Sequence, residues 1–325
     1  MTIVALTFLL SVLLCGGYLR IARKADIVDK PNARSSHTRE TPHAGGLPLF
    51  LAFFAGLSVV LITTPWPTVY ALVAGMAALL VLLGVLDDVF SLSVKLRFLL
   101  YAVLAVMAST IIIGLPATLG PAQTGLLIVL GSMAILWMLN LYNFMDGIDG
   151  IAAIQAVLTC ACAALLSCGE DARYALFCAL LGAAYLGFLI WNWPPARLFM
   201  GDAGSVPAGF LFACLALLGA AEGALNPACW LILLALFITD ATWTLLWRIG
   251  TGQPFTQGHR LHAYQRLSRH WQSHLKVDAA LIVVLLVWLG PLAWAAQKWP
   301  ENSIVLVILA YLPWVIAMAK VSRLT

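Results

Sequence analysis

Charged residues are scarce in this sequence. Of its 325 residues, 10% are charged and 62% are hydrophobic, whereas soluble proteins carry about 25% charged residues. So few charges cannot cover a water-facing surface, which excludes a soluble globular enzyme, and the composition also excludes a disordered, collagen-like or coiled-coil chain. The alternating segments of about ten residues that build membrane barrels are absent. The chain is therefore predicted to be an all-α polytopic integral membrane protein.

A Cys-x-x-Cys pair is also missing. The seven cysteines are odd in number and lie mostly inside apolar runs. They are interpreted as small buried residues rather than as a metal site or a disulfide framework. A bridge between Cys168 and Cys229, in neighbouring outer loops, is the one pairing left open.

Long apolar stretches account for most of the chain. A membrane helix needs about 20 consecutive residues that are mainly apolar, and eleven stretches meet this description. They run over about residues 3–19, 45–63, 69–86, 98–113, 123–141, 151–166, 174–191, 205–221, 228–247, 279–296 and 303–318. We therefore expect about eleven transmembrane helices.

The basic residues are distributed unevenly over the segments that connect and follow these stretches. Sixteen of the 18 Lys and Arg residues fall on one side, and only Arg173 and Lys298 fall on the other. By the positive-inside rule the rich side is cytoplasmic. The chain is therefore predicted to begin outside with an uncleaved first helix and to end in the cytoplasm.

No soluble domain fits between the apolar stretches, and no internal repeat is visible. Residues 1–325 are therefore expected to form one transmembrane catalytic domain. Its cytoplasmic loops are expected at about residues 20–44, 87–97, 142–150, 192–204 and 248–277. Function is expected within the membrane or at its cytoplasmic face.

Asp87 and Asp88 are adjacent carboxylates at the cytoplasmic end of an apolar stretch. Each would cost about 2.5–3.5 kcal/mol at the bilayer centre, so both are expected at the interface. Acidic charge at a helix C-terminus is opposed by the helix dipole. This favours a functional role, the alternative being a solvated helix end with Lys95 and Arg97 as counter-charges.

Asn143, Asp146 and Asp149 follow the fifth apolar stretch, together with Gly147 and Gly150. Glycine lets the backbone approach a ligand closely, and acids three residues apart can share a helix face. A polar turn between helices does not need two acids beside an amide. The segment is therefore predicted to be functional.

Asp202 opens the eighth apolar stretch within a Gly-Asp-Ala-Gly-Ser segment, after Asn192 and Phe199. A Gly-rich turn at a helix N-terminus offers N–H groups to an anion. The alternative is that Asp202 only caps the helix. Phe199 is expected either to stack on a base or to anchor the chain at the interface.

His259, Arg260 and His262 belong to the long basic loop before the last two stretches. A zinc site would need further Cys or His ligands nearby, and basic neighbours disfavour a cation. Arg and His together suit phosphate better. The alternative is an amphipathic segment that binds anionic lipid.

The first cytoplasmic loop contains Arg34 and His37 and ends at Gly45 and Gly46. Its Pro and Gly residues predict a structured loop, and the Gly-Gly pair is predicted to begin a helix as a second backbone seat for an anion.

Asp240 lies inside the ninth apolar stretch. An intramembrane acid is a functional candidate. The equally weighted alternative is a hydrogen bond to a nearby Thr or to a neighbouring helix.

Apart from Asp240, the polar segments described above are five in number, and all five fall on the cytoplasmic side. Segments with unrelated structural roles would be distributed over both faces. Mg²⁺ binds one or two carboxylates together with substrate phosphates, and cations stabilise the charge that moves in phosphoryl transfer. Acids beside Arg, His and glycine turns therefore indicate a magnesium-dependent diphosphate site. Its place at the membrane surface implies that one substrate is a lipid.

The same five segments, in this order, resemble the motifs of the polyprenyl-phosphate N-acetylhexosamine-1-phosphate transferase family (glycosyltransferase family 4) over nearly the whole chain. They are Asp29-Lys-Pro-Asn-Ala-Arg-Ser-Ser-His37 with Gly45-Gly46, Asp87-Asp88, Asn143-Phe-Met-Asp146-Gly-Ile-Asp149-Gly, Phe199-Met-Gly-Asp202-Ala-Gly-Ser205 and His259-Arg-Leu-His262-Ala-Tyr-Gln. The resemblance implies transfer of a sugar-1-phosphate from a UDP-sugar to undecaprenyl phosphate, with release of UMP, at the cytoplasmic face of a bacterial inner membrane.

The resemblance also implies roles for individual residues. Asp202, with Asn143, would bind Mg²⁺, for which Mn²⁺ can substitute. The catalytic residues would be Asp87, Asp88, Asp146, Asp149, His259 and His262. Substrate would be bound by Asn143, Gly147, Asn192, Phe199, Arg260, Arg34, His37, Gly45 and Gly46, with Phe199 stacked on uracil. Membrane lipid is an expected partner, nucleic acid is not, and a homodimer is left open.

Two motifs indicate which branch of the family this chain resembles. The muramyl-pentapeptide branch carries a triple-His run in the last loop and a Lys in the first-loop motif, whereas this chain has His259-Arg-Leu-His262 and His37-Thr-Arg-Glu-Thr-Pro. The subgroup that starts O-antigen or related surface polysaccharides is closer, with UDP-GlcNAc, UDP-GalNAc or UDP-N-acetylfucosamine as donor. The muramyl-pentapeptide and teichoic-acid branches are the alternatives within the family. A secondary transporter is the alternative from another class.

Overall fold

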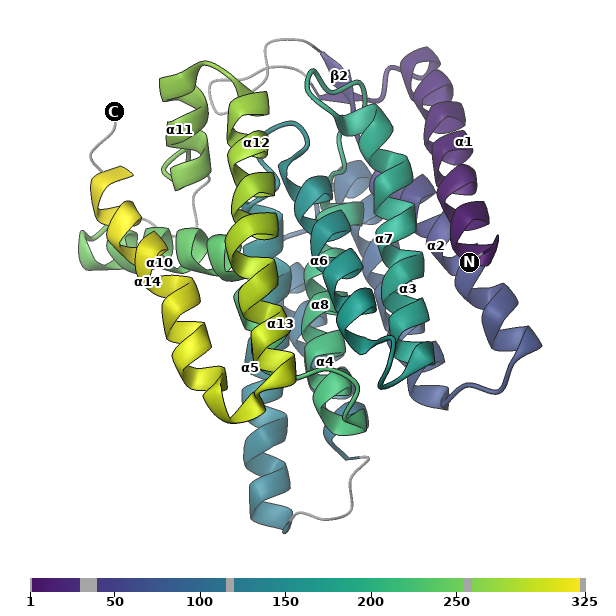
Figure 1. The fold of residues 1–325 in the computed structure, drawn as a ribbon. Helices are drawn as coiled ribbons and strands as arrows, with labels where there is room; N and C mark the ends of the chain where they lie inside the picture. Colours follow the sequence, from purple (N-terminus) through teal and green to yellow (C-terminus); the bar gives the residue numbers. More distant parts are fainter. Residues whose placement is uncertain (1, 30–39, 115–119, 254–258, 322–325) are drawn as a thin grey trace.

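The protein is a bundle of helices with a two-stranded sheet at one end (Figure 1). The computed structural model describes residues 2–29, 40–114, 120–253 and 259–321. The elements are α1 (Thr2–Lys24), β1 (Val28–Asp29), β2 (Thr41–Pro42), α2 (Gly46–Thr63), α3 (Thr68–Phe90), α4 (Val94–Ile113), α5 (Pro121–Phe144), α6 (Ile151–Ser167), α7 (Ala172–Asn192), α8 (Asp202–Glu222), α9 (Pro227–Leu233), α10 (Ala235–Gly250), α11 (Ala263–Trp271), α12 (His274–Val284), the π-helix η1 (Leu285–Leu289), α13 (Gly290–Lys298), the 3-10 turn η2 (Pro300–Asn302) and α14 (Ser303–Val321).

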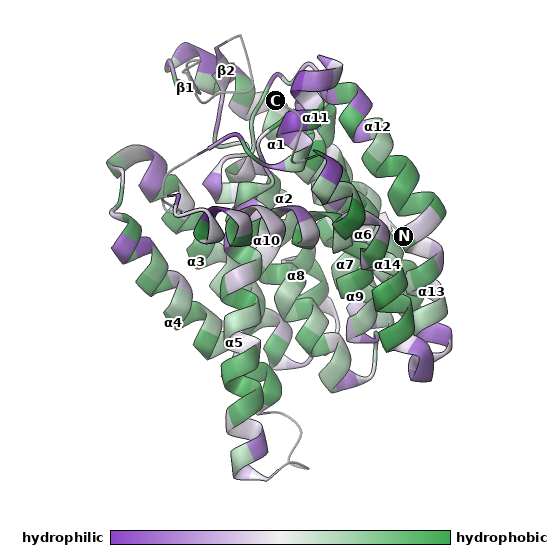
Figure 2. Ribbon diagram, turned by 90° about the vertical axis from the view of Figure 1, so that its left-hand side faces the viewer, coloured by the Kyte–Doolittle hydropathy of each residue, from purple (hydrophilic) through white to green (hydrophobic). Residues whose placement is uncertain are grey.

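Hydrophobic side chains cover the outside of the bundle. Val287 between α12 and α13 is 70% exposed, and Ile304 on α14 is 77% exposed, as suits helices that face lipid. Hydrophilic residues gather at the end that carries β1, β2 and α11, which we call the polar end (Figure 2). The all-α membrane architecture predicted from the sequence is confirmed.

The predicted number of eleven spans is not confirmed. In the described part of the chain, nine helices are long and apolar enough to cross a membrane, or ten if the bent pair α9 and α10 counts as one span. The predicted sixth span is present as α6, but this helix has only 17 residues. All seven cysteines are free, so the bridge between Cys168 and Cys229 does not form.

The predicted ninth span is broken near its middle. Helices α9 and α10 meet at Leu234 with a bend of 69°, so that α10 crosses the direction of the other helices (Figure 1). The amide Nε2 of Gln155, on α6, donates to the carbonyl of Leu233 at 2.9 Å. Because the side chain of Gln155 hydrogen-bonds this carbonyl, the helix can break sharply here without Pro or Gly.

Helix α8 lies at the centre, and glycines let two other helices approach its first turn. A Cβ atom on Gly46 of α2 would lie 2.1 Å from the backbone nitrogen of Gly204. A Cβ atom on Gly84 of α3 would lie 2.4 Å from the nitrogen of Ala203. These contacts bring the ends of α2 and α3 against the start of α8.

Adding one methyl group at this contact should destabilise the protein. We expect Gly84→Ala to lower the free energy of unfolding by about 1–3 kcal/mol, because the new group meets backbone that cannot move aside. Gly75→Ala, on the same helix with no atom within 4 Å of the new Cβ, is the matched control and should unfold at or above the wild-type temperature. Thermal unfolding in detergent measures both, and equal effects of the two changes would contradict the packing argument.

Candidate active site

Acidic residues from α3 and α8 meet beside a cation from α4. The guanidinium of Arg97 forms an ion pair with Asp87, and a second with Oδ2 of Asp202 at 3.1 Å. Oδ2 of Asp88 lies 3.6 Å from Nδ1 of His43. The structure therefore brings together the acidic pair and the Asp202 segment, which are more than 100 residues apart in the sequence.

Asp202 is held by hydrogen bonds rather than acting as a helix cap. It is the first residue of α8, and the N-cap position is Gly201, with φ of 71°. Oδ1 of Asp202 accepts a hydrogen bond from Nδ2 of Asn143 at 2.8 Å, and the same amide lies 3.2 Å from Oγ of Ser205. The interpretation of Asp202 as only an N-cap is therefore wrong, and Asn143 orients its carboxylate.

The turn between α5 and α6 is tied to the loop that precedes α8. Oδ2 of Asp149 accepts from the backbone N–H of Ala196 at 3.0 Å. Asn192 accepts from the N–H of Gly150 at 3.0 Å through Oδ1 and donates to the carbonyl of Leu198 through Nδ2. Both ends of the Asn192 amide are thus engaged by backbone, so this residue shapes the site.

A cavity of about 500 Å³ opens among these segments at the polar end. Eight of the predicted site residues line it: Asp88, Asn143, Asp146, Gly147, Asp149, Asn192, Phe199 and Asp202. Asp87 is not among the lining residues, but Arg97 pairs with both Asp87 and Asp202, which does line the cavity. The predicted substrate-binding residues Arg34 and His37 lie outside the described residues.

The lining of this cavity is strongly acidic. Five carboxylates line it, from Asp29, Asp88, Asp146, Asp149 and Asp202, and none of its described lining residues is Lys or Arg. Burial, and then the nearby Asp202 and Asp149, raise the pKa of Asp146 to about 7. The hydrogen bond with Asp88 raises the pKa of His43.

Gly45 and Gly46 do not form the predicted anion seat. Their N–H groups donate to the carbonyls of Phe199 and Met200, at 2.8 and 2.9 Å. A Cβ atom on Gly45 would lie 2.7 Å from the ring of Phe188. The pair is glycine because the chain packs closely against the loop before α8 and the start of that helix. Substrate binding by these two residues stays a prediction.

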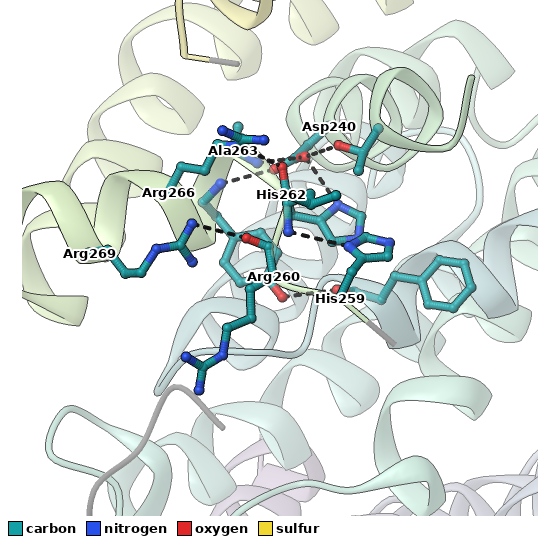
Figure 3. A network of polar contacts seen from close by, with 11 residues as sticks. Asp240, His259, Arg260, His262, Ala263, Arg266 and Arg269 are labelled. Carbon is teal, nitrogen blue, oxygen red and sulfur yellow. Dashed lines mark hydrogen bonds and ion pairs between the residues drawn. The ribbon is translucent and has the colours of Figure 1, made fainter. Parts of the chain in front are cut away.

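His259, Arg260 and His262 of the basic loop lie beside the cavity and are not among its described lining residues. Asp240 of α10 accepts hydrogen bonds from the backbone N–H groups of Ala263 and Tyr264, at 2.9 and 3.1 Å, and lies 3.2 Å from Nδ1 of His262 (Figure 3). It therefore caps the first turn of α11 from another helix. Of the two alternatives for Asp240, hydrogen bonding to a neighbouring segment is the one observed.

The rings of His259 and His262 lie in contact in a tilted arrangement, with centroids 4.9 Å apart and an interplanar angle of 31°. Burial, and then His262 and Arg248, lower the pKa of His259 to about 4, so His259 is neutral near pH 7. The backbone carbonyl of Arg260 accepts from the Arg269 guanidinium at 3.0 Å. Catalytic roles for His259 and His262, and substrate binding by Arg260, stay predictions.

Several residues at the site are not among the predicted functional residues, including Asp29, His43, Arg97, Gln265 and His274. Arg97 was interpreted only as a counter-charge, although its place ten residues after Asp87 on the following helix is a signal for an ion pair. Gln265 and His274 both line the cavity. Gln265 directly follows the Ala-Tyr pair of the last motif, whereas no sequence pattern marks His274.

Carboxylate oxygens, the hard ligands that Mg²⁺ prefers, are therefore concentrated in one cavity. Among the described residues no three His, Cys, Asp or Glu side chains are arranged to hold a metal ion by themselves. A site with one or two carboxylates, completed by water and substrate phosphate, matches the usual magnesium pattern. The residues present thus fit a Mg²⁺ ion that is bound together with a phosphorylated substrate.

An acid-lined cavity at the polar end of a lipid-facing bundle is typical of a membrane enzyme that acts on phosphorylated substrates. The sequence pattern of glycosyl transferase family 4 matches residues 70–220, which include most of the cavity acids. The chain belongs to this family, as its motifs indicated, and it is a membrane phosphoglycosyl transferase.

Three relatives show how far the similarity extends. A probable undecaprenyl-phosphate N-acetylglucosaminyl 1-phosphate transferase of Bacillus subtilis (strain 168) is 32% identical, over 82% of this chain and 76% of the relative. An undecaprenyl-phosphate alpha-N-acetylglucosaminyl 1-phosphate transferase of Escherichia coli (strain K12) is 28% identical, over 90% and 83%. A decaprenyl-phosphate N-acetylglucosaminephosphotransferase of Mycobacterium leprae (strain TN) is 25% identical, over 86% and 78%.

The raised pKa of Asp146 predicts a pH-dependent stability. Because the folded protein binds this proton more tightly than the unfolded chain, whose Asp pKa is about 3.9, stability should fall as the pH rises from about 4 to about 7. Asp146→Asn should remove part of that fall. Unfolding in EDTA at pH 5 and pH 8 measures it, with Asp26→Asn, a change at an exposed residue, as the control for losing one charge. An unchanged pH dependence in Asp146→Asn would show that this carboxyl titrates normally.

Asp240→Ala should release α11 from α10. The change leaves the two buried N–H donors of Ala263 and Tyr264 without their acceptor, at a cost of about 1–3 kcal/mol each. We expect a lower unfolding temperature and faster tryptic cleavage after Arg266 and Arg269. Thr251→Ala, at the exposed end of α10, is the control. Wild-type cleavage rates in Asp240→Ala would contradict the capping role.

Proposed function

We propose that the protein transfers N-acetylglucosamine 1-phosphate from UDP-N-acetylglucosamine to undecaprenyl phosphate and releases UMP, as the first step of a cell-envelope polysaccharide. The acidic cavity carries this proposal. Five carboxylates repel an anionic sugar nucleotide unless a divalent cation enters with it, and this combination is the chemistry of a metal-dependent diphosphate site. The names of the relatives supply the sugar and the lipid.

Finer parts of the proposal come from the sequence. The amino-acid sequences of the motifs favour O-antigen or a related surface polysaccharide as the product. UDP-GalNAc and UDP-N-acetylfucosamine are the other candidate donors. The 16 Lys and Arg residues on one side favour a cytoplasmic orientation of the polar end. In this orientation the cavity faces the compartment that contains sugar nucleotides.

In this mechanism Asp202 and Asn143 would hold Mg²⁺, with Mn²⁺ able to substitute. A bound divalent cation offsets the negative charge that develops on the transferred phosphoryl group and on the leaving UMP. Asn143 orients Asp202 through the 2.8 Å hydrogen bond. Arg97 holds Asp87 and Asp202 together through its two ion pairs.

We favour a single displacement. A phosphate monoester has a second pKa of about 6, so the lipid phosphate is mostly dianionic near pH 7 and needs no strong base. Its oxygen forms a bond to the β-phosphorus of the donor while the bond from that phosphorus to the bridging oxygen breaks, and UMP leaves with the electron pair. Asp87 and Asp88 would orient the lipid phosphate through the metal or through Arg97 and His43.

The two-step alternative has Asp87 or Asp88 attack the donor and form a phospho-enzyme. The pairing of Asp87 with Arg97 disfavours attack by Asp87, because a carboxylate held by a guanidinium is a weaker nucleophile. Radioactive sugar phosphate retained on the protein in the absence of lipid would establish the two-step route instead.

UMP release tests the proposed function. Purified protein in detergent, given undecaprenyl phosphate, Mg²⁺ and a panel of UDP-sugars, should release UMP fastest from UDP-N-acetylglucosamine and only with lipid and metal present. Asp202→Asn should lower the rate on the order of 100-fold or more, because the metal loses its charged ligand. Glu301→Gln, an exposed acid near the end of α13 that is remote from the cavity, is the matched control. If folded protein released no UMP from any donor, this result would overturn the transferase proposal and favour the alternative that the protein is a secondary transporter.

A further inference from the structure

Exposed basic residues gather where α1 ends. Arg20, Arg23 and Lys24, which we call the α1 basic cluster, lie in the last two turns of this helix, and all three are exposed. In the described part of the chain none of them forms an ion pair with a carboxylate. The partial negative charge at a helix C-terminus offsets only part of three full positive charges. This end of α1 is therefore a cationic surface.

Close packing of α1 against α7 fixes the position of this surface. Oγ of Ser11 donates to the carbonyl of Ala184 at 2.6 Å. A Cβ atom on Gly187 would lie 2.6 Å from Cβ of Ser11 and 2.7 Å from the carbonyl oxygen of Phe8. The backbones of the two helices therefore touch, and both helices end at the polar end near β2 (Figure 1).

The indole of Trp191, near the end of α7, lies on α1. Its Nε1 donates to the carbonyl of Val12 at 3.0 Å, and a Cβ atom on Gly16 would lie 2.6 Å from its Cζ2. Residues four apart share one face of a helix, so Val12, Gly16 and Arg20 form one row. Arg20 thus follows the indole by one turn of α1 on the side of the polar end.

Arg197 approaches the same indole from the loop that follows α7. This loop folds back on itself, because the backbone N–H of Arg197 donates to the carbonyl of Trp191 at 2.8 Å. The exposed guanidinium lies 4.7 Å from the centroid of the Trp191 ring and donates to the carbonyl of Ile190 at 3.2 Å. A cation–π contact of this kind holds an arginine in place without cancelling its charge. Arg20 and Arg197 therefore flank one indole ring.

Apolar side chains adjoin this pair of arginines. Leu13 and Ile21 on α1 are 71% and 63% exposed, and Trp193 in the loop is 42% exposed. Exposed leucine and isoleucine suit the acyl-chain region of a bilayer, whereas Trp is enriched at the level of the headgroups. Arginines beside such residues match the depth at which the phosphates of phospholipids lie.

The chemistry of this surface selects an anionic lipid. Arginine forms charge-assisted and often bidentate hydrogen bonds with phosphate oxygens. A choline or ethanolamine headgroup adds an ammonium, which the α1 basic cluster and Arg197 repel. A glycerol headgroup adds only hydroxyl groups, so the lipid keeps its negative charge. Phosphatidylglycerol therefore fits this surface better than a zwitterionic lipid.

We infer that Arg20 and Arg197, on either side of Trp191, bind the headgroup phosphate of an anionic glycerophospholipid together with the rest of the α1 basic cluster. This site is separate from the acidic cavity, whose described lining contains none of these residues. The loop of Arg197 also carries Phe199, which lines the cavity, and Asn192 binds the carbonyl of the residue before it. A lipid that bridges Arg20 and Arg197 would therefore fasten this loop to α1.

Thermal unfolding with added lipid tests the inference without any sugar nucleotide. In maltoside detergent, palmitoyl-oleoyl phosphatidylglycerol should raise the unfolding temperature in a saturable way, and high salt should weaken the effect. Phosphatidylcholine with the same acyl chains should have little effect. In the double variant Arg20→Gln, Arg197→Gln, half-maximal stabilisation should need on the order of tenfold more phosphatidylglycerol. Arg173→Gln, which removes an exposed charge at the opposite end of α7, is the matched control and should respond like wild type.

A second double variant separates charge from shape. Arg20→Lys with Arg197→Lys keeps both charges and should retain most of the response. An equal response of the glutamine variant and wild type, or equal stabilisation by phosphatidylcholine and phosphatidylglycerol, would overturn the inference. Full stabilisation by inorganic phosphate would show that the site takes a free anion. Displacement of phosphatidylglycerol by equimolar undecaprenyl phosphate would assign the site to a prenyl phosphate, and either result would overturn the assignment to a phospholipid.

Discussion

The mutual repulsion of carboxylates around one cavity is the constraint on which the site depends. A chain with few charges places five acids on the walls of a single cavity of about 500 Å³, where the effective dielectric is lower than in water. Arg97 neutralises part of this charge through Asp87 and Asp202, and backbone or amide N–H groups satisfy Asp202 and Asp149. Burial, and only then the nearby Asp202 and Asp149, raises the pKa of Asp146, so part of the repulsion stays uncompensated. A cation that enters with an anionic substrate relieves this repulsion, so the acids are arranged for binding both together.

The acids can converge only because the backbones that carry them touch. Gly46 and Gly84 place α2 and α3 against Ala203 and Gly204, at distances that no side chain allows. Asp87 and Asp88 lie one turn beyond Gly84, and Asp202 directly precedes Ala203. The acidic pair can therefore reach Asp202 only because these two positions are glycine, since a wider separation of the helices would move Asp87 and Asp88 away from Asp202. The same packing accounts for Gly45 and Gly46, whose N–H groups are taken by the loop before α8.

The sequence predicts the parts of this molecule that local chemistry decides. Apolar runs locate the helices, and scarce charge on such a background marks Asp88, Asn143, Asp146, Asp149 and Asp202, all of which line the cavity. Features that depend on distant partners could not be predicted.

Two examples show why. The break at Leu234 contains neither Pro nor Gly and is supported by Gln155 from another helix, so composition alone indicates a continuous span. His274 stands at the start of an apolar run, and only its contact with the turn 125 residues earlier places it in the site.

The break also explains how the C-terminal part of the chain reaches the cavity. Because α10 turns away from α9 by 69°, Asp240 comes to lie against the first turn of α11 and accepts its N–H groups. Helix α11 is thereby held where the Tyr264 hydroxyl donates to the carbonyl of Phe144 at 2.9 Å and Gln265 borders the cavity. A straight continuation of α9 would carry Asp240 along the bundle and leave α11 without this cap. The bend between α9 and α10 thus places the buried Asp240 where it can hold α11, and α11 in turn places Gln265 in the cavity wall.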